Sequence, residues 1–234
     1  MNQIKHNSQP TVSELRRERE RTAMAAKIMS AARKMFVSDG YEAVTLRKVA
    51  TAIEYSPAAI YQYFKDKESL VRAIIKADSQ DLREYVVNCL EVEDPIDRLD
   101  EMARRYVNWA IEHPNHYRLM LVPPPVWAKQ QDLPEAERAP MEQEALFALN
   151  AIVKEAIDLG ILKEKYTNST LVAATLWAGI HGTLLLEITV SAKVRAQLGG
   201  KDISFETRFE TILEMFRDAL LKDSTERPLG AKPL

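Results

Sequence analysis

The chain has 234 residues, 46% of them hydrophobic and 28% charged, which is enough apolar material for one large domain or two modest ones. Its single cysteine, Cys89, excludes an intramolecular disulfide and a cysteine-based metal site. A reducing interior is the simplest compartment for such a chain. The N-terminus lacks the apolar stretch of a signal peptide, and no run approaches the roughly 18 apolar residues of a membrane span, so we expect a soluble, cytoplasmic protein without membrane contact.

The charges are unevenly distributed along the chain. The net charge of −2 does not by itself indicate a nucleic-acid partner. Residues 1–76, however, carry 14 Lys+Arg against 8 Asp+Glu, whereas the remainder carries 18 against 26, so a charge of +6 precedes one of −8. A basic N-terminal third on an acidic remainder fits a DNA-binding head on a body with another task. Gly is scarce, at 7 residues, and apolar residues rarely alternate with period two, so we expect an all-α fold.

Residues 1–20 form an N-terminal extension for which two structures are open. The segment Ser13–Arg21 (SELRRERER) is strongly charged and rich in helix formers. It can extend the next helix outward, or it can remain a basic arm whose arginines reach phosphates or a minor groove. Glutamates alternate with the arginines, which favours a solvated, charged helix end.

An amphipathic helix is predicted over Thr22–Ser38. Gly40 follows Asp39 in the usual place of a left-handed residue that terminates a helix. One apolar stripe along this helix consists of Ile28, Ala32, Met35 and Phe36.

The stretch Thr45–Lys67 (TLRKVATAIEYSPAAIYQYFKDK) has the layout of a helix-turn-helix. Thr45 can cap a first short helix, and Ser56 can cap a second one with Pro57 at its first position, where a missing N–H costs nothing. The distance between the two caps leaves room for one short helix and a turn of about three or four residues. The residues at helical spacing that we expect to face the core are Leu46, Val49, Ala50, Ile53, Ile60 and Phe64.

The outer face of the second short helix carries the chemistry of DNA recognition. Pro57 and Ala58 are small enough for close approach to a groove floor and for contact with thymine methyl groups. Gln62 can pair with an adenine edge, and the hydroxyls of Tyr61 and Tyr63 suit phosphate oxygens. The alternative is that the two tyrosines are half-buried packing residues; we favour the DNA-binding interpretation.

The order AARKMFVSDGYEAVTLRKVATAIEYSPAAIYQYFKDKESL resembles the N-terminal domain of the TetR/AcrR family of bacterial transcriptional repressors, and the similarity covers about Met24–Ile75. Family members bind palindromic operators as homodimers and release them when a small molecule binds the C-terminal domain. The resemblance implies phosphate contacts near the first cap and base contacts from the second helix. The residues that we expect to contact double-stranded DNA are Thr45, Arg47, Ser56, Pro57, Ala58, Tyr61, Gln62, Tyr63 and Lys67.

The chain departs from the family pattern at two places. Glu54-Tyr55 stand in the turn where the family commonly has Gly-Val, so a negative charge replaces a residue that easily adopts positive φ. Pro57-Ala58 follow the capping serine where the family often has Lys-Gly. Both departures leave the operator sequence open, and neither affects the predicted fold.

Six helices are predicted for the body, over Lys67–Glu93, Pro95–Glu112, Asn115–Leu121, Glu135–Leu159, Asn168–Val190 and Ser204–Lys222. Between the third and the fourth, the segment Val122–Pro134 contains three consecutive prolines, which exclude a helix. Trp127 in this segment can fold over a pocket as a lid, or it can plug the core.

The helix predicted over Asn168–Val190 is the most apolar part of the chain. Because it contains a Glu and a His, we interpret it as a buried helix rather than a membrane span. Gly179 and Gly182, together with neighbouring alanines, leave a flat surface that another helix can approach closely. The last two helices carry more apolar surface than one small domain needs, so we expect them to pair across a two-fold axis as a four-helix bundle in a homodimer.

HPNHYRLML, followed later by LWAGIHGTLLLE, resembles the C-terminal subclass of the family that is named for its Trp-His-Gly pattern, here Trp177, His181 and Gly182. In this family the region around His181 can line the ligand pocket, although a mid-helix histidine among apolar residues is more often hydrogen-bonded within the core. Aromatic residues at helical spacing are likewise more often plain core. With that alternative open, the candidate ligand-binding residues are Met102, Tyr106, Trp109, Tyr117, Met120, Trp127, Phe147, Trp177 and His181.

His113 and His116 have a spacing that a metal site can use, but no cysteine is near and the surrounding carboxylates are typical of a helix surface. We therefore expect no metal and no cofactor. The sequence contains no Ser-His-Asp set, no paired carboxylates and no Gly-rich phosphate loop, so we recognise no catalytic motif in it.

These observations divide the chain into a charged extension (1–20), a helix-turn-helix DNA-binding head (21–68), a ligand-binding and dimerisation body (69–222) and a disordered tail (223–234). The first hypothesis is a homodimeric repressor that a small apolar or weakly polar effector releases from a palindromic operator. The second is a DNA-binding regulator without a ligand, which is constitutive or controlled by a protein partner. The third is a small-molecule-binding enzyme whose head only mediates oligomerisation.

Overall fold

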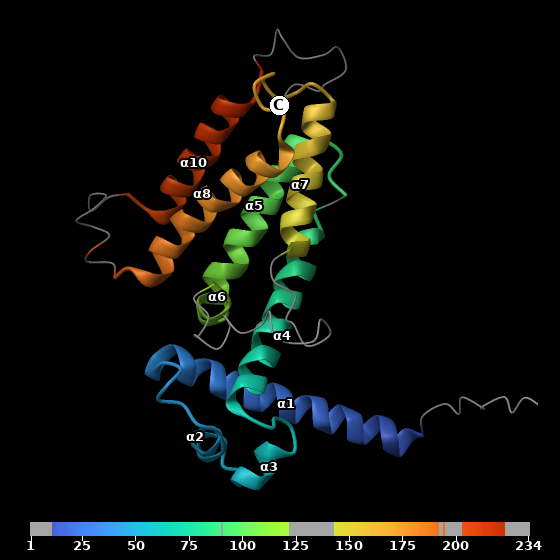
Figure 1. Cartoon of the computed structure of the whole chain (residues 1–234), viewed down its shortest axis with the longest axis vertical. Helices are drawn as coiled ribbons and strands as arrows, with labels where there is room; N and C mark the ends of the chain where they lie inside the picture. The colour runs from blue at the N-terminus through green and yellow to red at the C-terminus, as the bar shows by residue number, and fades with distance from the viewer. Residues whose placement is uncertain (1–10, 90, 122–142, 192–193, 195–202, 223–234) are drawn as a thin grey trace, which may run out of the picture. The chain divides into compact units, whose positions relative to one another are not determined.

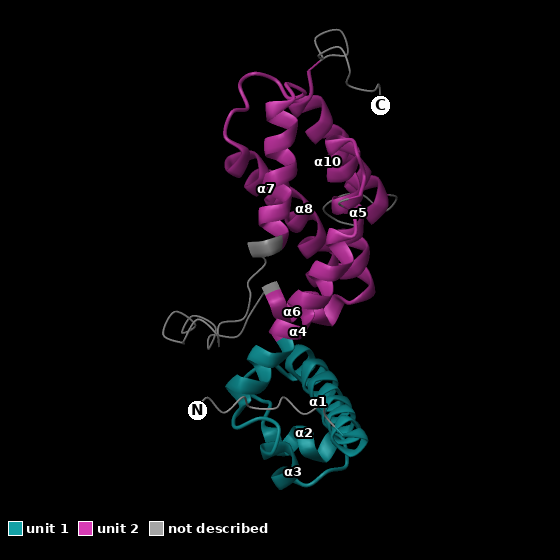
Figure 2. Cartoon of the chain, turned by 90° about the vertical axis from the view of Figure 1, so that its right-hand side faces the viewer, with its two compact units in different colours: residues 1–74 teal, residues 75–234 magenta. Residues whose placement is uncertain are grey.

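The computed structural model describes residues 11–89, 91–121, 143–191, 194 and 203–222, and these residues are helical apart from turns and one isolated β-bridge. Figure 1 shows the helices in chain order. They form two compact units, residues 1–74 and 75–234, which are coloured separately in Figure 2. The all-α prediction is therefore confirmed for the described part of the chain.

The N-terminal unit contains α1 (Val12–Asp39), α2 (Leu46–Ala52), α3 (Pro57–Tyr61) and the first residues of α4 (Lys67–Val87). Helix α1 begins ten residues earlier than predicted, because Thr11 and Glu14 form a capping box at its start. The segment Ser13–Arg21 is thus a solvent-exposed helix end, the interpretation that the alternating charges favoured. Helix α3 ends at Tyr61, since the N–H groups of Tyr63 and Phe64 both bond to the carbonyl of Ile60.

The core of this unit follows the predicted helical spacing. All six residues predicted to face inward from the helix-turn-helix are buried, as are three of the four stripe residues of α1, whereas Met35 is half-buried. Val44 and residues of the first two turns of α4 complete the core. The buried apolar side chains of this unit are Ile28, Ala32, Phe36, Val44, Leu46, Val49, Ala50, Ile53, Ile60, Phe64, Leu70, Val71 and Ile74.

The turn between α2 and α3 places Glu54 in the left-handed region, with φ of 63°. A side chain with a Cβ adopts this conformation at a cost that glycine does not have. The N–H groups of Glu54 and Tyr55 bond back to Thr51 and Ala50, so the turn is closed by hydrogen bonds in spite of this cost.

The C-terminal unit consists of the rest of α4 with α5 (Pro95–Glu112), α6 (Pro114–Leu121), α7 (Gln143–Asp158), α8 (Ser169–Thr189) and α10 (Phe205–Leu220). Helix α4 ends at Val87, six residues before the predicted end. Residue 90, the predicted loop Val122–Pro134 with Trp127, residues 135–142, most of 192–202 and the tail 223–234 lie outside the described residues.

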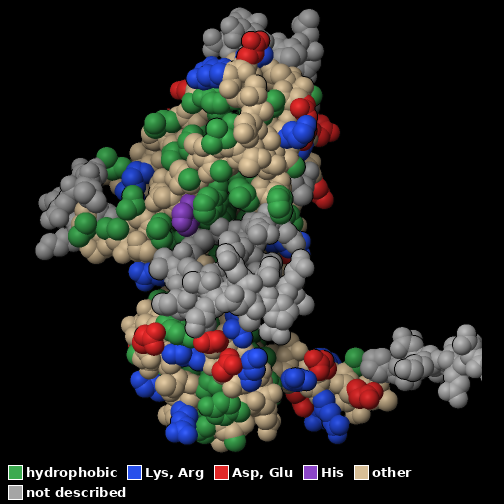
Figure 3. All heavy atoms as spheres, in the orientation of Figure 1, with side chains coloured by type: hydrophobic (Ala, Val, Ile, Leu, Met, Phe, Trp, Pro, Cys, Tyr) green, Lys and Arg blue, Asp and Glu red, His purple; other side chains and the backbone are tan. Residues whose placement is uncertain are grey.

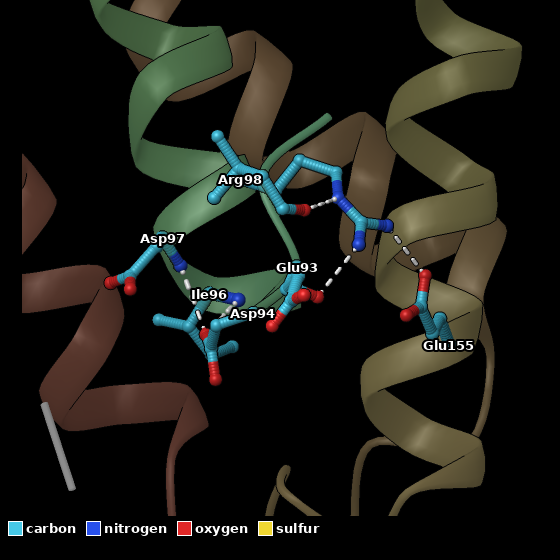
Figure 4. Close-up of polar contacts among 7 residues, drawn as sticks. Glu93, Asp94, Ile96, Asp97, Arg98 and Glu155 are labelled. Atoms are coloured by element: carbon cyan, nitrogen blue, oxygen red, sulfur yellow. Dashed lines mark hydrogen bonds and ion pairs between the residues drawn. The ribbon is translucent and has the colours of Figure 1, made fainter. Parts of the chain in front are cut away.

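Asp94 and Arg98 position the start of α5 against α7 (Figure 4). Asp94 Oδ1 accepts hydrogen bonds from the N–H groups of Ile96 and Asp97 at 2.8 and 3.1 Å, which caps α5. Arg98 Nη1 donates to Glu155 Oε2 on α7 at 2.6 Å and Nη2 donates to the carbonyl of Glu93 at 2.8 Å. One apolar cluster joins α5, α7, α8 and the end of α10, with Ile96, Val153, Val172 and Leu221 among its buried members.

Helices α8 and α10 run side by side (Figure 1) and approach each other closely at Gly179. A Cβ at this position would lie 2.5 Å from Cζ of Phe216 on α10, whereas a Cβ at Gly182 would meet nothing within 4 Å. Gly179 therefore allows α8 to pack closely on α10, whereas the space beside Gly182 is open.

The prediction that α8 is a buried helix is wrong for the single chain. By length and composition α8 could cross a membrane, a test that the core helix of a soluble protein also passes, and only 22% of its most apolar window is buried. Helix α8 is apolar on all sides, so the helices packed against it leave part of its apolar surface uncovered.

We expect Glu54→Gly to raise the free energy of unfolding of the N-terminal unit by about 1 kcal/mol, because glycine adopts positive φ without a Cβ clash. Hydrogen exchange of the α2 and α3 amides measures this change locally. Glu54→Ala is the matched control, since it removes the same charge but keeps a Cβ. An equal gain in both variants would attribute the effect to charge instead of backbone strain.

Candidate DNA-binding and ligand-binding sites

The residues predicted to contact DNA lie on α2, on α3, in the turns beside them and at the start of α4. Seven of the nine are exposed, namely Thr45, Arg47, Ser56, Pro57, Ala58, Tyr61 and Gln62. Tyr61 is 53% exposed although it is a large aromatic residue, while its neighbour Ile60 is 1% exposed. The short helix therefore buries its apolar anchor and presents an aromatic hydroxyl and an amide to solvent.

Thr45 and Ser56 use their side chains to start the two short helices. Thr45 Oγ1 accepts from the N–H of Lys48 at 3.2 Å, and Ser56 Oγ accepts from the N–H of Ala59 at 3.3 Å. Because both hydroxyls act as acceptors in these bonds, each keeps its own O–H group to donate to a phosphate oxygen. The caps and the candidate phosphate contacts are the same groups.

Tyr63 and Lys67 are half-buried, and Lys67 has a structural role that sequence reasoning missed. Its Nζ donates to the carbonyl of Tyr41 at 2.9 Å and lies 3.9 Å from the centroid of the Tyr41 ring. This contact ties the start of α4 to the segment before α2. Burial, with the nearby carboxylate of Glu68, raises the pKa of Tyr41 above its ordinary value.

Tyr55 also projects from the turn, with 41% of its surface exposed. The Nζ of Lys27 on α1 lies 4.8 Å from its ring centroid, which braces the turn against α1. Sequence reasoning assigned no role to either residue, and no local pattern relates two residues this far apart in the chain.

The C-terminal unit contains a cavity of about 320 Å³ between α4, α5, α7, α8 and α10, a size within the range of small-molecule sites. Most of its lining is aliphatic or aromatic, including Leu82, Leu99, Leu146 and Phe216. The polar groups in the lining come from Ser79, Gln80, Arg83, Asp100, Tyr106 and Arg217.

The structure brings four of the nine candidate ligand-binding residues to this cavity, namely Met102, Tyr106, Met120 and Trp177. Tyr117 and His181 contact lining residues without lining the cavity themselves, and Trp109 packs on His113 and His116 instead. Phe147 is 66% exposed on α7, and Trp127 is outside the described residues. Sequence reasoning missed the lining residues Arg83, Asp100 and Arg217, because charged residues on amphipathic helices usually lie on the solvated face.

A chain of hydrogen bonds leads from the cavity wall to His181. The hydroxyls of Tyr106 and Tyr117 lie 3.0 Å apart, and the hydroxyl of Tyr117 lies 2.7 Å from Nδ1 of His181. Trp177 stacks on the imidazole with ring centroids 4.8 Å apart. His181 is thus a hydrogen-bonded histidine within the packing of α8, and desolvation by burial lowers its pKa from the ordinary value.

His113 and His116 pack around Trp109 instead of forming a metal site. His113 stacks on Trp109 with centroids 5.0 Å apart, and Trp109 Nε1 donates to Asp81 Oδ2 at 3.0 Å. His116 Nδ1 lies 3.3 Å from Oδ1 of the buried Asp78 on α4. Among the described residues, no group of three or more His, Cys, Asp or Glu side chains is arranged to hold a metal ion.

Two family profiles match the chain. One, described as bacterial regulatory proteins of the tetR family, matches residues 28–74. The other, described as tetracyclin repressor-like, C-terminal domain, matches residues 99–216, slightly more than half of the chain. The first match contains the helix-turn-helix, and the second contains most of α5, helices α6 to α8 and most of α10.

Part of the chain is also similar to individual regulators. It is 36% identical over 85 residues to the HTH-type transcriptional repressor AcnR of Corynebacterium glutamicum, a match that covers 33% of this chain and 45% of that protein. The chain thus matches less than half of the length of such curated relatives.

The fold is also similar to that of solved structures that cover most of this chain. A TetR family transcriptional regulator, PfmR from Thermus thermophilus, has a TM-score of 0.63 at 20% identity and covers 83% of this chain and 99% of its own. The SmeT–triclosan complex has a TM-score of 0.62 at 21% identity, with 91% of this chain and 99% of its own covered. At these identities the likeness concerns the fold.

The lowered pKa of His181 predicts a pH dependence of folding stability. The unfolded state binds a proton near pH 6.5 while the folded state resists it, so stability falls as pH decreases below about 6.5. We expect His181→Gln to lose part of this decrease, measured by urea unfolding between pH 5 and 8. Tyr117→Phe, which keeps the titrating imidazole, should retain a decrease; an unchanged pH profile in His181→Gln would contradict the assignment.

Proposed function

The chain belongs to the TetR family of bacterial regulatory proteins, and on this premise we propose that it is a transcriptional repressor. It binds a palindromic operator as a homodimer and leaves the DNA when a small molecule occupies the cavity of its C-terminal unit. The family consists of regulators and not enzymes, which removes the enzyme hypothesis. The protein acts in the cytoplasm, where its DNA is.

The observation that supports DNA binding is the exposed face of α3 and of Gln62, which directly follows it. Ile60 is buried while Ala58, Tyr61 and Gln62 are exposed, so recognition groups face outward on a helix that the core fixes in place. Gln62 reads a base edge, and Tyr61 and Tyr63 hold phosphates. Two such helices in a dimer enter major grooves about 34–36 Å apart or slightly more.

Homodimer formation is supported by apolar surface that the single chain leaves uncovered. Figure 3 shows hydrophobic side chains exposed over the body. The large exposed hydrophobic residues of α8 and α10 include Leu171, Leu186 and Met215, at 64%, 54% and 64% exposure. The open space beside Gly182 allows a helix of a second copy to come close. Together α8 and α10 make a two-helix face that forms a four-helix bundle with its copy.

Ligand response is supported by the cavity and by the course of α4. This helix begins at Lys67 in the N-terminal unit, and its residues 79–86 contribute to the cavity lining. A ligand changes operator affinity only through different affinities for the DNA-bound and the released conformations. The alternative, a regulator that is constitutive or controlled by a protein partner, predicts that nothing binds in the cavity.

The assignment to the Trp-His-Gly subclass is part of this proposal. Trp177 and His181 stack on each other and Gly182 follows them on α8. Trp177 lines the cavity, so this pattern lies between the proposed ligand site and the proposed dimer face.

Selection of bound sequences from a random DNA pool, at physiological salt, tests the operator proposal. We expect a palindrome with two equal half-sites. Tyr63→Ala should weaken binding to all sequences alike, because it removes a phosphate contact, whereas Gln62→Ala should relax the base preference at one position in each half-site, by about 1–3 kcal/mol. Identical behaviour of the two variants, or binding that is salt-sensitive but sequence-indifferent, would contradict the assigned roles.

Met215→Glu tests the dimer face. A carboxylate in the centre of an apolar bundle cannot be solvated, so we expect a monomer in light scattering and a loss of operator affinity on the order of 100-fold or more. Phe147→Glu is the matched control, since Phe147 is 66% exposed on α7, outside the proposed face. A dimer that survives Met215→Glu but not Phe147→Glu would move the interface to α7.

A further inference from the structure

The charged groups of the cavity lining are few and gathered on three helices. Among the described residues, the lining contains two guanidinium groups, Arg83 on α4 and Arg217 on α10, and one carboxylate, Asp100 on α5. The charged side chains of the lining therefore sum to +1. The rest of the wall is mostly apolar, so a ligand meets a few charged groups and a large apolar surface.

Arg217 has one N–H donor that no group of the described residues accepts. Its Nη2 forms an ion pair with Asp100 Oδ2, which connects α10 to α5. Its Nε is buried and has no hydrogen-bond partner within the described part of the chain. A guanidinium presents five N–H donors in a planar fork, and a carboxylate is the acceptor whose two oxygens match that fork.

The apolar surface runs along one face of α5. Its lining residues Ile96, Leu99, Ala103 and Tyr106 follow helical spacing on both sides of Asp100. Ten residues of α helix at a rise of about 1.5 Å give a wall on the order of 15 Å long. Leu146 and Leu149 of α7 and Leu176 of α8 face the same space. Because Arg217 meets Asp100 within this wall, a linear aliphatic chain whose end group lies at Arg217 runs from there along α5 toward Tyr106.

We propose that the effector is an amphipathic carboxylic acid whose carboxylate binds Arg217 and whose apolar body lies along α5. This inference rests on the proposed function, because it names the ligand class of the same cavity. The ligand carboxylate competes with Asp100 for the guanidinium of Arg217. Binding thereby weakens the contact between α5 and α10, the second of which is part of the proposed dimer face.

Three probes of equal chain length separate the end group from the apolar tail: decanoate, decanol and decylamine. Calorimetry with the full-length protein at neutral pH, below the concentrations at which the probes aggregate, gives the three dissociation constants. We expect decanoate to bind about tenfold more tightly than decanol or more, and decylamine to bind most weakly, because a charge-assisted bond to arginine is available only to the acid.

Arg217→Gln should reduce the preference for decanoate over decanol to below about threefold while leaving the affinity for decanol nearly unchanged. The matched control is Arg104→Gln. Arg104 forms the neighbouring ion pair between α5 and α10, with Glu210, but does not line the cavity, so its loss should leave the preference intact. Arg217→Lys keeps the charge without the fork and should give an intermediate preference.

The outcomes distinguish this inference from the proposed function. Equal affinities of decanoate and decanol in the wild-type protein would overturn the carboxylate assignment and leave an apolar ligand site in place. Tighter binding of decylamine would instead assign the polar end to Asp100. Binding of none of the three probes would overturn the inference, and if operator binding persisted, it would favour the regulator without a ligand.

Discussion

The N-terminal unit depends on the burial of a few apolar side chains from helices that are too short to be stable alone. Helices α2 and α3 have 7 and 5 residues, well below the length at which an isolated helix forms in water. Val49, Ile60 and Phe64 hold them against α1 and the start of α4, and hydroxyl caps begin both. Because the anchors are buried, the groups that we assign to DNA face solvent with fixed directions.

The turn between α2 and α3 carries a conformational cost at Glu54. The turn between the two helices needs one residue with positive φ, and the chain places a glutamate where glycine would be unstrained. Two backbone hydrogen bonds close the turn, and Tyr55 is braced by Lys27 of α1. Stability alone would favour glycine at this position.

In the C-terminal unit, α8 packs on α10, lines the cavity and presents apolar side chains outward. Gly179 admits Phe216 of α10, Trp177 lines the cavity and stacks on His181, and Leu171 and Leu186 face outward. A helix that is apolar on all sides can do this only if something covers the outward face, which is the physical reason for expecting a second copy. The cavity and the proposed dimer face are then connected through one helix and through the Asp100–Arg217 pair.

The sequence by itself determined where most helices lie, the caps at Thr45 and Ser56, and the buried side of the helix-turn-helix, because these depend on local hydrogen bonds and on a period of 3.6 residues. Tertiary structure alone decided which aromatic residues reach the cavity: Tyr106 and Trp177 do, whereas Trp109 and Phe147, with equally favourable spacing, are packed elsewhere or exposed. It also decided that Lys67 binds Tyr41 and that Arg217 meets Asp100. Such contacts join residues far apart in the chain, and no local pattern specifies how two helix faces meet.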